Sequence, residues 1–183
     1  GESHGPAVLC LVEGLPAGLE VKKDRINAEL ARRQRGYGRG GRMKIEQDEV
    51  EILTGIRHGL TLGSPVTLVV RNKDHANWAD VMSPDVVPEA ERAASLSKRE
   101  RTSPRPGHAD LAGALKYLTK DLRNIIERSS ARDTAGRVAA GMLAQSVLDV
   151  FGVEVASHVI RIENAVNEAP VPFDTMSAAS QSD

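Results

Sequence analysis

Small residues recur at close intervals through residues 131–151, and this segment constrains the fold more than any other part of the chain. Its alanines and glycines lie among larger aliphatic residues: Ala135, Gly136, Ala139, Ala140, Gly141 and Ala144 among Val138, Leu143, Val147 and Leu148. Each glycine lowers helix propensity slightly, but side chains this small let neighbouring elements approach a helix closely on several sides. The segment is therefore predicted to form a central, buried helix.

Other patterns predict strands and two further helices. Strands are expected over residues 7–12, 50–52, 65–70 and 153–162, where apolar residues alternate with polar ones or form short runs. A helix is expected from Asp24, a suitable cap, to Gly36, with Ile26 and Leu30 on its apolar face. A leucine-rich, core-facing helix is expected over residues 109–128. These patterns by themselves support a mixed α/β fold and nothing narrower.

Length and composition exclude several classes of protein. A chain of 183 residues is about one domain long and can bury roughly two thirds of its unfolded surface. The net charge of −1 gives no overall positive field for nucleic acid or an anionic membrane, and 3% aromatic residues are too few for base stacking. The single cysteine, Cys10, is expected to be a small core side chain in a cytoplasmic protein.

The chain as given shows no targeting or membrane segment. It has no basic-then-apolar leader and no apolar stretch approaching ~18 residues. The absence of an initiator Met leaves a removed leader open. No membrane partner and no nucleic-acid partner are expected.

Residues 32–44 form the most basic stretch, with six cations and no acid. Glycines there let backbone amides and guanidinium groups converge on a phosphate or carboxylate, although a solvated basic turn is the plainer interpretation. Gly36, Gly38 and Gly41 have the spacing of a dinucleotide-binding fingerprint, but that motif needs a strand before it and a helix after it, the reverse of the order here. The stretch stays a candidate anion site, and a non-catalytic anion- or RNA-binding module built on it is the alternative function.

Two histidines and a serine-containing run also suit acid–base or anion chemistry. His4 lies in the glycine-flanked opening segment, directly ahead of the first predicted strand. His108 is placed at the first turn of the leucine-rich helix, where the helix dipole favours a neutral imidazole that can relay a proton; a polar cap is the plainer interpretation. Ser130 has capping-box spacing to Asp133, and a helix start flanked by Arg128 also suits an anionic group.

Four segments resemble, in the same order, those of the chorismate synthase family: residues 1–5, 32–44, 105–111 and 128–135. Asp133 stands where the family pattern has Glu, which keeps the charge. The resemblance implies a layered α/β (α+β-like) sandwich with helices between antiparallel sheets, assembled as a homotetramer. Because the family chain is nearly twice as long, residues 1–163 are expected to be the N-terminal part of the domain. Residues 164–183 are expected to be a mobile tail or the connection to a C-terminal half.

The resemblance also implies a reaction. The family is a carbon–oxygen lyase that eliminates phosphate from 5-enolpyruvylshikimate 3-phosphate to give chorismate, in the shikimate pathway of aromatic amino acid biosynthesis, using reduced FMN without net oxidation. The implied roles are protonation of the leaving phosphate for His4, proton exchange with the flavin for His108, substrate binding for Arg33, Arg39 and Arg42, and flavin binding for Arg128, Ser129 and Ser130.

Several points stay open at this stage. NADPH is a candidate reductant, and either the protein itself or a partner flavin reductase could supply reduced FMN. An NAD(P)-dependent oxidoreductase is a second enzyme interpretation. Residues 72–75 with Trp78 are interpreted as an ordered loop, and the resemblance leaves a place near the active site open for them. No metal site is predicted, because no His, Cys or carboxylate pair has ligand spacing. The chain alone is expected to be inactive, because the family's proton-removing Asp lies in the later half.

Overall fold

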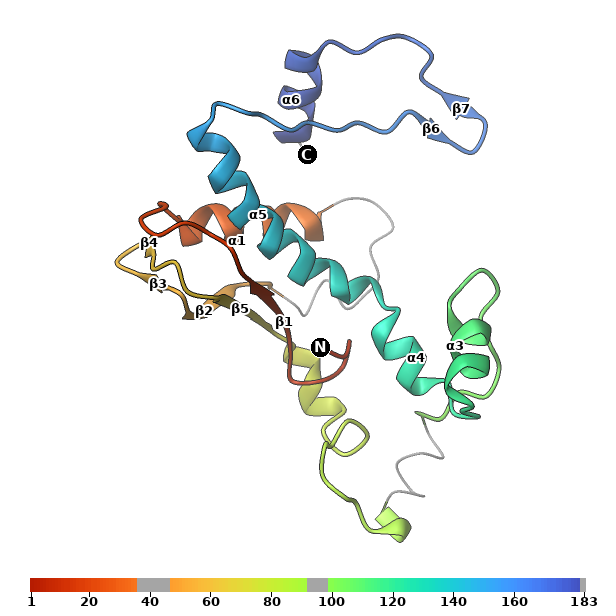
Figure 1. The fold of residues 1–183 in the computed structure, drawn as a ribbon. Helices are drawn as coiled ribbons and strands as arrows, with labels where there is room; N and C mark the ends of the chain where they lie inside the picture. The colour runs from red at the N-terminus through yellow and green to blue at the C-terminus, as the bar shows by residue number, and fades with distance from the viewer. Residues whose placement is uncertain (36–46, 92–98, 182–183) are drawn as a thin grey trace.

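The computed structural model describes residues 1–35, 47–91 and 99–181 (Figure 1). Within them, the centre of the fold is a three-stranded antiparallel sheet in the order β1-β5-β2. Its strands are β1 (Ala7–Val12), β2 (Val50–Thr54) and β5 (Val66–Arg71). Two helices, α1 (Lys23–Gln34) and α5 (Thr134–Val150), pack against each other, and α5 lies along β1 and β5. The predicted mixed α/β fold of helices and antiparallel sheets is confirmed.

The hydrophobic core lies between this sheet and the two helices. Its buried members are Val21, Ile26, Leu30, Val50, Val66, Leu68, Val70, Ala135, Ala139 and Leu143. Ile26 and Leu30 are the pair on which the helix prediction depended, and both are buried as expected. Cys10 packs partly buried against the core, and burial raises the pKa of its thiol. It therefore behaves as the small apolar side chain that the sequence predicted.

Helix α5 is the small-residue helix, and it buries one face. Ala135, Gly136 and Ala139 are buried against the sheet side, whereas Gly141 is exposed. A Cβ atom at position 136 would lie 3.1 Å from a methyl carbon of Val8, so the missing side chain lets β1 approach the helix closely. The predicted helix is confirmed over residues 134–150, but it is buried on one face rather than on several sides. In the described part of the chain, the predicted close approach occurs on this one face.

The two glycines of α5 form a matched pair for a stability measurement. A Cβ atom at position 141 would meet nothing within 4 Å, so Gly141→Ala is expected to raise the free energy of unfolding by about 0.5–1 kcal/mol through helix propensity alone. Gly136→Ala gains the same propensity but must displace Val8, and overpacking a core costs about 1–3 kcal/mol. Urea unfolding should therefore find Gly136→Ala the less stable of the two. Equal stabilities would contradict the close packing of α5 on β1.

The leucine-rich segment differs from its prediction. It forms two helices, α3 (Asp110–Tyr117) and α4 (Arg123–Arg128), rather than one. Leu118 adopts a left-handed conformation with φ of 50° and ends α3, which spacing alone does not reveal. Leu111 and Leu115 are exposed, whereas Leu122 and Ile125 at the start of α4 are buried. The prediction of one core-facing helix was therefore wrong for its first half.

Smaller elements complete the chain. A short hairpin, β3 (Ile56–Arg57) and β4 (Leu60–Thr61), precedes β5, and the 3-10 helices η2 (Lys73–Asn77) and η3 (Ala131–Asp133) precede and follow the α3–α4 region. Beyond α5, the chain extends away from the sheet through β6 (Arg161–Ile162), β7 (Ala165–Val166) and α6 (Phe173–Gln181) (Figure 1). None of the described helices is long and apolar enough to cross a lipid bilayer.

Two further expectations were wrong in detail. The strand predicted over residues 153–162 exists only at Arg161–Ile162, because within the described residues it pairs only with β7 and the rest of the segment has no ladder partner. Asp24 does not cap α1, since Lys22 occupies the N-cap position and Asp24 lies in the first turn. Alternation of apolar residues indicates a strand only where a neighbouring strand can satisfy its backbone.

Candidate active site

The N-terminal loop and the loop after β5 are brought together by strand pairing. β1 and β5 are antiparallel, with Ala7 opposite Arg71, so the residues before β1 must lie beside those after β5. Asn72 fixes this arrangement: its backbone N–H donates to the carbonyl of Pro6 at 3.0 Å and its side-chain amide to the carbonyl of Gly5 at 2.7 Å. The pairing therefore places His4 against η2.

His4 is held by a carboxylate from a distant part of the chain. Its ring Nδ1 lies 2.8 Å from Oε1 of Glu127, and its backbone N–H donates to Oε2 of the same residue at 2.7 Å. Glu127 belongs to α4, 123 residues away in sequence, and its side chain is completely buried. Ser3 adds a third link, because its backbone N–H donates to the Glu127 carbonyl at 3.2 Å. Residue 4 is thus fixed on both its backbone and its ring.

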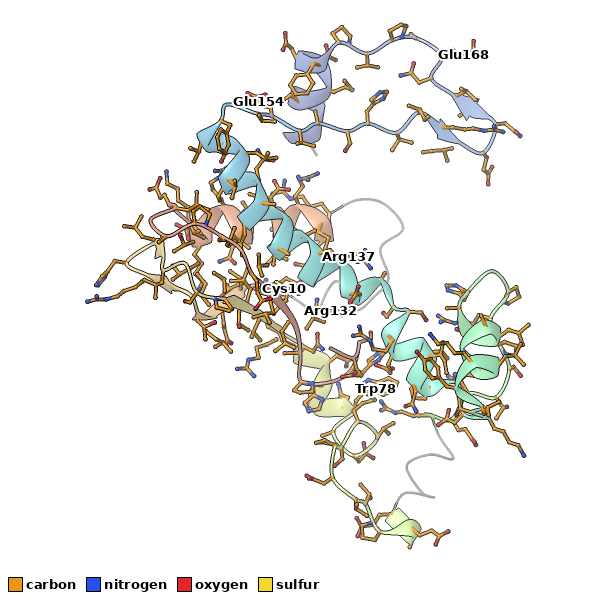
Figure 2. The ribbon with its side chains drawn as sticks, in the orientation of Figure 1. Cys10, Trp78, Arg132, Arg137, Glu154 and Glu168 are labelled. Carbon is orange, nitrogen blue, oxygen red and sulfur yellow. The ribbon has the colours of Figure 1, made fainter. Side chains whose placement is uncertain are left out.

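An aromatic ring and a second carboxylate complete the surroundings of His4. The ring of Trp78 stacks on the imidazole with centroids 3.9 Å apart and an interplanar angle of 28°. Asp74 accepts hydrogen bonds from the Trp78 indole at 3.2 Å and from the Asn77 side-chain amide at 3.0 Å, and its Oδ2 lies 3.9 Å from His4 Nε2. The imidazole is therefore enclosed on the Nδ1 side by Glu127 and faces Asp74 with Nε2. Trp78 is labelled in Figure 2 below the N-terminal loop.

Glu127 is ionised in this environment. Burial opposes its ionisation, but hydrogen bonds from the ring and backbone of His4 and from Arg123 outweigh burial and lower the pKa of its carboxyl. Arg123, one turn earlier on α4, donates to Oε1 at 3.2 Å. Arg123 also donates to the carbonyl of Arg99, and the Arg99 guanidinium lies 3.8 Å from the Trp78 ring centre. The carboxylate, the two arginines and the indole thus form one connected cluster around His4.

A second, buried charge cluster adjoins the first. Both oxygens of Asp48 accept from arginines, one from Arg33 and the other from Arg132, each at 2.5 Å. Arg132 also donates to the Asn72 side chain at 2.6 Å, which links this cluster to the N-terminal loop. The three charged side chains are at most 7% exposed. Figure 2 labels Arg132 where the start of α5 meets the sheet. The cluster therefore joins the end of α1, the sheet and the start of α5.

The serine run lies beside the N-terminal loop. Ser3 donates its hydroxyl to Ser130 at 2.9 Å, and Arg128 donates to the carbonyl of Gly1 at 2.7 Å. Ser130 caps η3 as predicted, but it accepts from the backbone of Arg132, and the Asp133 side chain accepts from Arg137 where a capping box would have it bond back to Ser130. Ser129 instead donates to the carbonyl of Ile125 and accepts from Arg105 at 3.4 Å. The run thus contacts the N-terminal loop through Ser130 and the segment before α3 through Ser129.

His108 lies on the α3 side of this region. It is exposed and precedes α3 by two residues, with Ala109 at the N-cap, so it is not in the first turn as predicted. In the loop before α3, Arg105 donates three hydrogen bonds to the carboxylate of Asp110, the first residue of α3. Two come from its side chain, from Nε and a terminal nitrogen at 2.9 Å each, and one comes from its backbone N–H. These hydrogen bonds, which outweigh the effect of burial, lower the pKa of Asp110 to about 2.

This pKa shift predicts how acid affects stability. The pKa of Asp110 is 3.8 when unperturbed and about 2 in the fold, so the folded protein favours the carboxylate and unfolding takes up a proton at low pH. The contribution is fully present above about pH 4 and is lost as the pH falls toward 2. Unfolding of the wild type and of Asp110→Asn should therefore differ most above pH 4 and converge toward pH 2. A difference that grows with falling pH would contradict the Arg105–Asp110 pair.

A cavity of about 700 Å³ opens between α3 and α4. Its walls include Ala109, which follows His108, and Ser129 and Arg128 of the serine run; the other lining residues are Ala112, Gly113, Lys116, Tyr117, Thr119, Asn124 and Ile125. The volume is in the range of small-molecule sites, about 300–1,000 Å³. The cations at its edge and the aromatic and aliphatic walls suit a ligand with an anionic group and a flat ring.

The structure places some of the predicted site residues together, whereas others lie apart or outside the described residues. It hydrogen-bonds Ser130 to Ser3, the residue before His4, puts Arg128 and Ser129 at the cavity, and places His108 next to a residue that lines it. Arg33 is paired with Asp48, although its buried Nε has no hydrogen-bond partner among the described residues. Arg39 and Arg42 lie outside the described residues. Their roles stay predictions.

Sequence reasoning missed the residues that hold His4. Glu127, Arg123 and Asp48 carry no motif of their own, and they become neighbours of the site only through the fold. Asp74 and Trp78 lie in the segment whose place near the active site was left open, and they contact His4. Among the described residues, no group of three His, Cys, Asp or Glu side chains is arranged to hold a metal ion.

Comparison with known proteins gives one consistent result. The chorismate synthase family matches residues 1–183. A chorismate synthase of Symbiobacterium thermophilum is 58% identical over 174 residues, covering 95% of this chain and 44% of that protein. One from a Geobacillus species is 57% identical over 162 residues, covering 88% of this chain and 41% of that protein. A crystal structure of chorismate synthase superposes with a TM-score of 0.67 at 39% identity, over 92% of this chain and 38% of that one. The chain spans less than half the length of these relatives.

Proposed function

The chain belongs to the chorismate synthase family, and on that basis we propose that it supplies part of the active site of an enzyme that converts 5-enolpyruvylshikimate 3-phosphate to chorismate and phosphate. The reaction is a carbon–oxygen lyase step of the shikimate pathway. Within this chain, the main structural support for the proposal is a set of hydrogen bonds around His4. The opening segment and residues 127–130, more than 120 positions apart, are hydrogen-bonded together around His4.

The elimination places demands that these residues can meet. A departing phosphate needs a proton and cationic groups to stabilise its charge. His4 presents Nε2 away from Glu127 and is the proposed proton donor. Arg33, Arg39 and Arg42 are the proposed substrate clamp. The role of Arg33 is supported by its buried Nε, which has no hydrogen-bond partner in the described part of the chain. This N–H group could donate to an anion.

The α3–α4 cavity is the candidate site for the reduced FMN that the family resemblance implies. We propose that Arg128 and Ser129 bind FMN there, with Ser130 beside them and His108 next to the lining residue Ala109; the cations, hydroxyls and apolar side chains of the lining support this. Reduced FMN, when bound, supplies transient electron density to the breaking carbon–oxygen bond. This chain's residues would orient it and hold water away from the reacting atoms. NADPH as reductant, a partner flavin reductase, a homotetramer and a cytoplasmic location remain predictions.

The proposal is tested in a protein that carries this chain within the full family length. With chemically reduced FMN and 5-enolpyruvylshikimate 3-phosphate, chorismate should appear, and FMN should raise the melting temperature. Salt-sensitive RNA binding, with no chorismate and no response to flavin, would instead support the anion- or RNA-binding module. Turnover of NAD(P)H with a 2-electron change in substrate would point to an oxidoreductase.

The substrate clamp gives a sharper prediction. Arg39→Ala is expected to weaken binding of the phosphorylated substrate by about 1.5–3 kcal/mol, the scale of one hydrogen bond to a charged group. FMN affinity should change little, because the basic stretch lies far in sequence from Arg128 and Ser129. Separate titrations with substrate and with FMN measure both effects. Equal losses for the two ligands would show that they share this arginine.

A further inference from the structure

Glu127 is the most completely buried acid near His4, and its position is set by several elements at once. Its side chain is 0% exposed, whereas that of His4 is 19% exposed. Helix α4 presents it, and Arg123 one turn earlier on the same helix neutralises it. A buried carboxylate persists only when paired and hydrogen-bonded. Of the three donors that contact this carboxylate, two belong to a single residue, His4, which is partly exposed to solvent.

The hydrogen-bond pattern fixes the proton on one ring nitrogen. An ionised carboxylate can only accept hydrogen bonds, and Glu127 is ionised because its partners lower its pKa. His4 Nδ1 lies 2.8 Å from this carboxylate, so Nδ1 must carry a hydrogen. His75 holds the backbone of the same residue by donating from its Nδ1 to the His4 carbonyl at 2.9 Å. Trp78 stacks on the ring and limits its rotation.

We propose that Glu127 is a positioning residue for His4, which keeps hydrogen on Nδ1 and makes Nε2 the nitrogen that exchanges a proton with the substrate. The kinetic part of this inference rests on the proposed function. In the elimination, protonated His4 gives its Nε2 hydrogen to the bridging oxygen of the departing phosphate. The electron pair of the carbon–oxygen bond leaves with that oxygen. His4 ends neutral, with its remaining hydrogen on Nδ1, and the proton lost from the substrate carbon goes to a separate carboxylate base.

A glutamine at position 127 tests the inference because it keeps the shape and removes the charge. Three donors meet this side chain, from Arg123, the His4 backbone and the His4 ring. An amide oxygen cannot accept all three, and the NH₂ group will face at least one donor. Of the three donors, only the imidazole nitrogen can become an acceptor, by moving its hydrogen to Nε2. Glu127→Gln should therefore shift part of His4 to the Nε2–H tautomer.

The experiment measures the tautomer and the kinetics of the full-family-length protein. ¹⁵N NMR on histidine-labelled protein, with the His4 signals assigned from their loss in His4→Gln, should show hydrogen on Nδ1 in the neutral wild type. Glu127→Gln should show the shift to Nε2 and lose about 10²- to 10⁴-fold in kcat, with little change in KM. Glu127→Asp keeps the charge, so it should keep hydrogen on Nδ1 and recover part of the lost kcat. Glu51→Gln, at an exposed pair with Arg71 on the sheet, is the matched control and should match the wild type.

The outcomes separate this inference from a structural role and from the proposed function. A wild type with hydrogen on Nε2, or a folded Glu127→Gln with unchanged tautomer and kcat, would overturn the inference. If Glu127→Gln does not fold, Glu127→Asp decides: hydrogen retained on Nδ1 supports the inference, and hydrogen on Nε2 overturns it. A wild type that makes no chorismate would overturn the proposed function alone, because the tautomer measurement would still test Glu127.

Discussion

Replacing His4 with alanine in a full-length protein is expected to lower chorismate formation by about 10²- to 10⁴-fold, the usual scale for loss of a positioned general acid. The ring is hydrogen-bonded to Glu127 through Nδ1 and stacked on Trp78, and its Nε2 is directed away from Glu127, on the side of Asp74. Substrate binding should weaken less than turnover, because a proton donor acts mainly in the transition state. Steady-state kinetics with reduced FMN measures both parameters.

The control for this variant is another histidine in the same chain. His158 is exposed in the segment after α5, away from the cluster around His4, so His158→Ala makes the same chemical change and should keep wild-type turnover. Melting temperatures of both variants check that each is folded. A folded His4→Ala variant with wild-type turnover would remove His4 from the chemistry.

Asp48→Asn is expected to have the largest effect on stability, a loss of about 3–5 kcal/mol. The Asp48 side chain is fully buried, and it is the shared partner of two arginines that are 7% and 5% exposed. Neutralising it removes the carboxylate that two buried guanidinium groups share, and each guanidinium is largely shielded from water. Chemical unfolding of the wild type and the variant measures the difference in free energy.

The matched control is a carboxylate of the same type in an exposed ion pair. Asp149 pairs with Arg25 on the surface, with side chains 37% and 49% exposed, so Asp149→Asn should lose only about 0.2–1 kcal/mol. Because both variants convert aspartate to asparagine, the comparison isolates burial. Similar losses for the two variants would contradict the account of Asp48 as the centre of a buried cluster.

Local patterns were sufficient to predict the elements of the core. The apolar run at residues 66–70 indicates a strand from its own residues alone. Ile26 and Leu30 are four residues apart, which in a helix puts both on the same face. The small residues of α5 were recognisable because tight helix packing selects them. The left-handed Leu118 was not predictable, since leucine rarely adopts that conformation and the spacing on either side continues the helical pattern.

The candidate site was predictable only as separate segments. His4 and the run 128–130 were recognised by resemblance, but nothing in their sequence says that Glu127 holds His4, because the two are 123 residues apart. The position of Asp74 and Trp78 beside His4 follows from the order and pairing of the strands. Once β1 is paired antiparallel with β5, the loop after β5 must lie beside the N-terminal loop. Such pairing depends on long-range contacts that a single sequence does not show.

The stoichiometry of the reaction tests the central claim most directly. A full-length protein containing this chain, supplied anaerobically with reduced FMN and a known amount of 5-enolpyruvylshikimate 3-phosphate, is assayed for phosphate, chorismate and flavin oxidation state. The account predicts one phosphate and one chorismate for each substrate consumed, with the flavin still reduced at the end. Phosphate released without chorismate, or one flavin oxidised for each turnover, would contradict it.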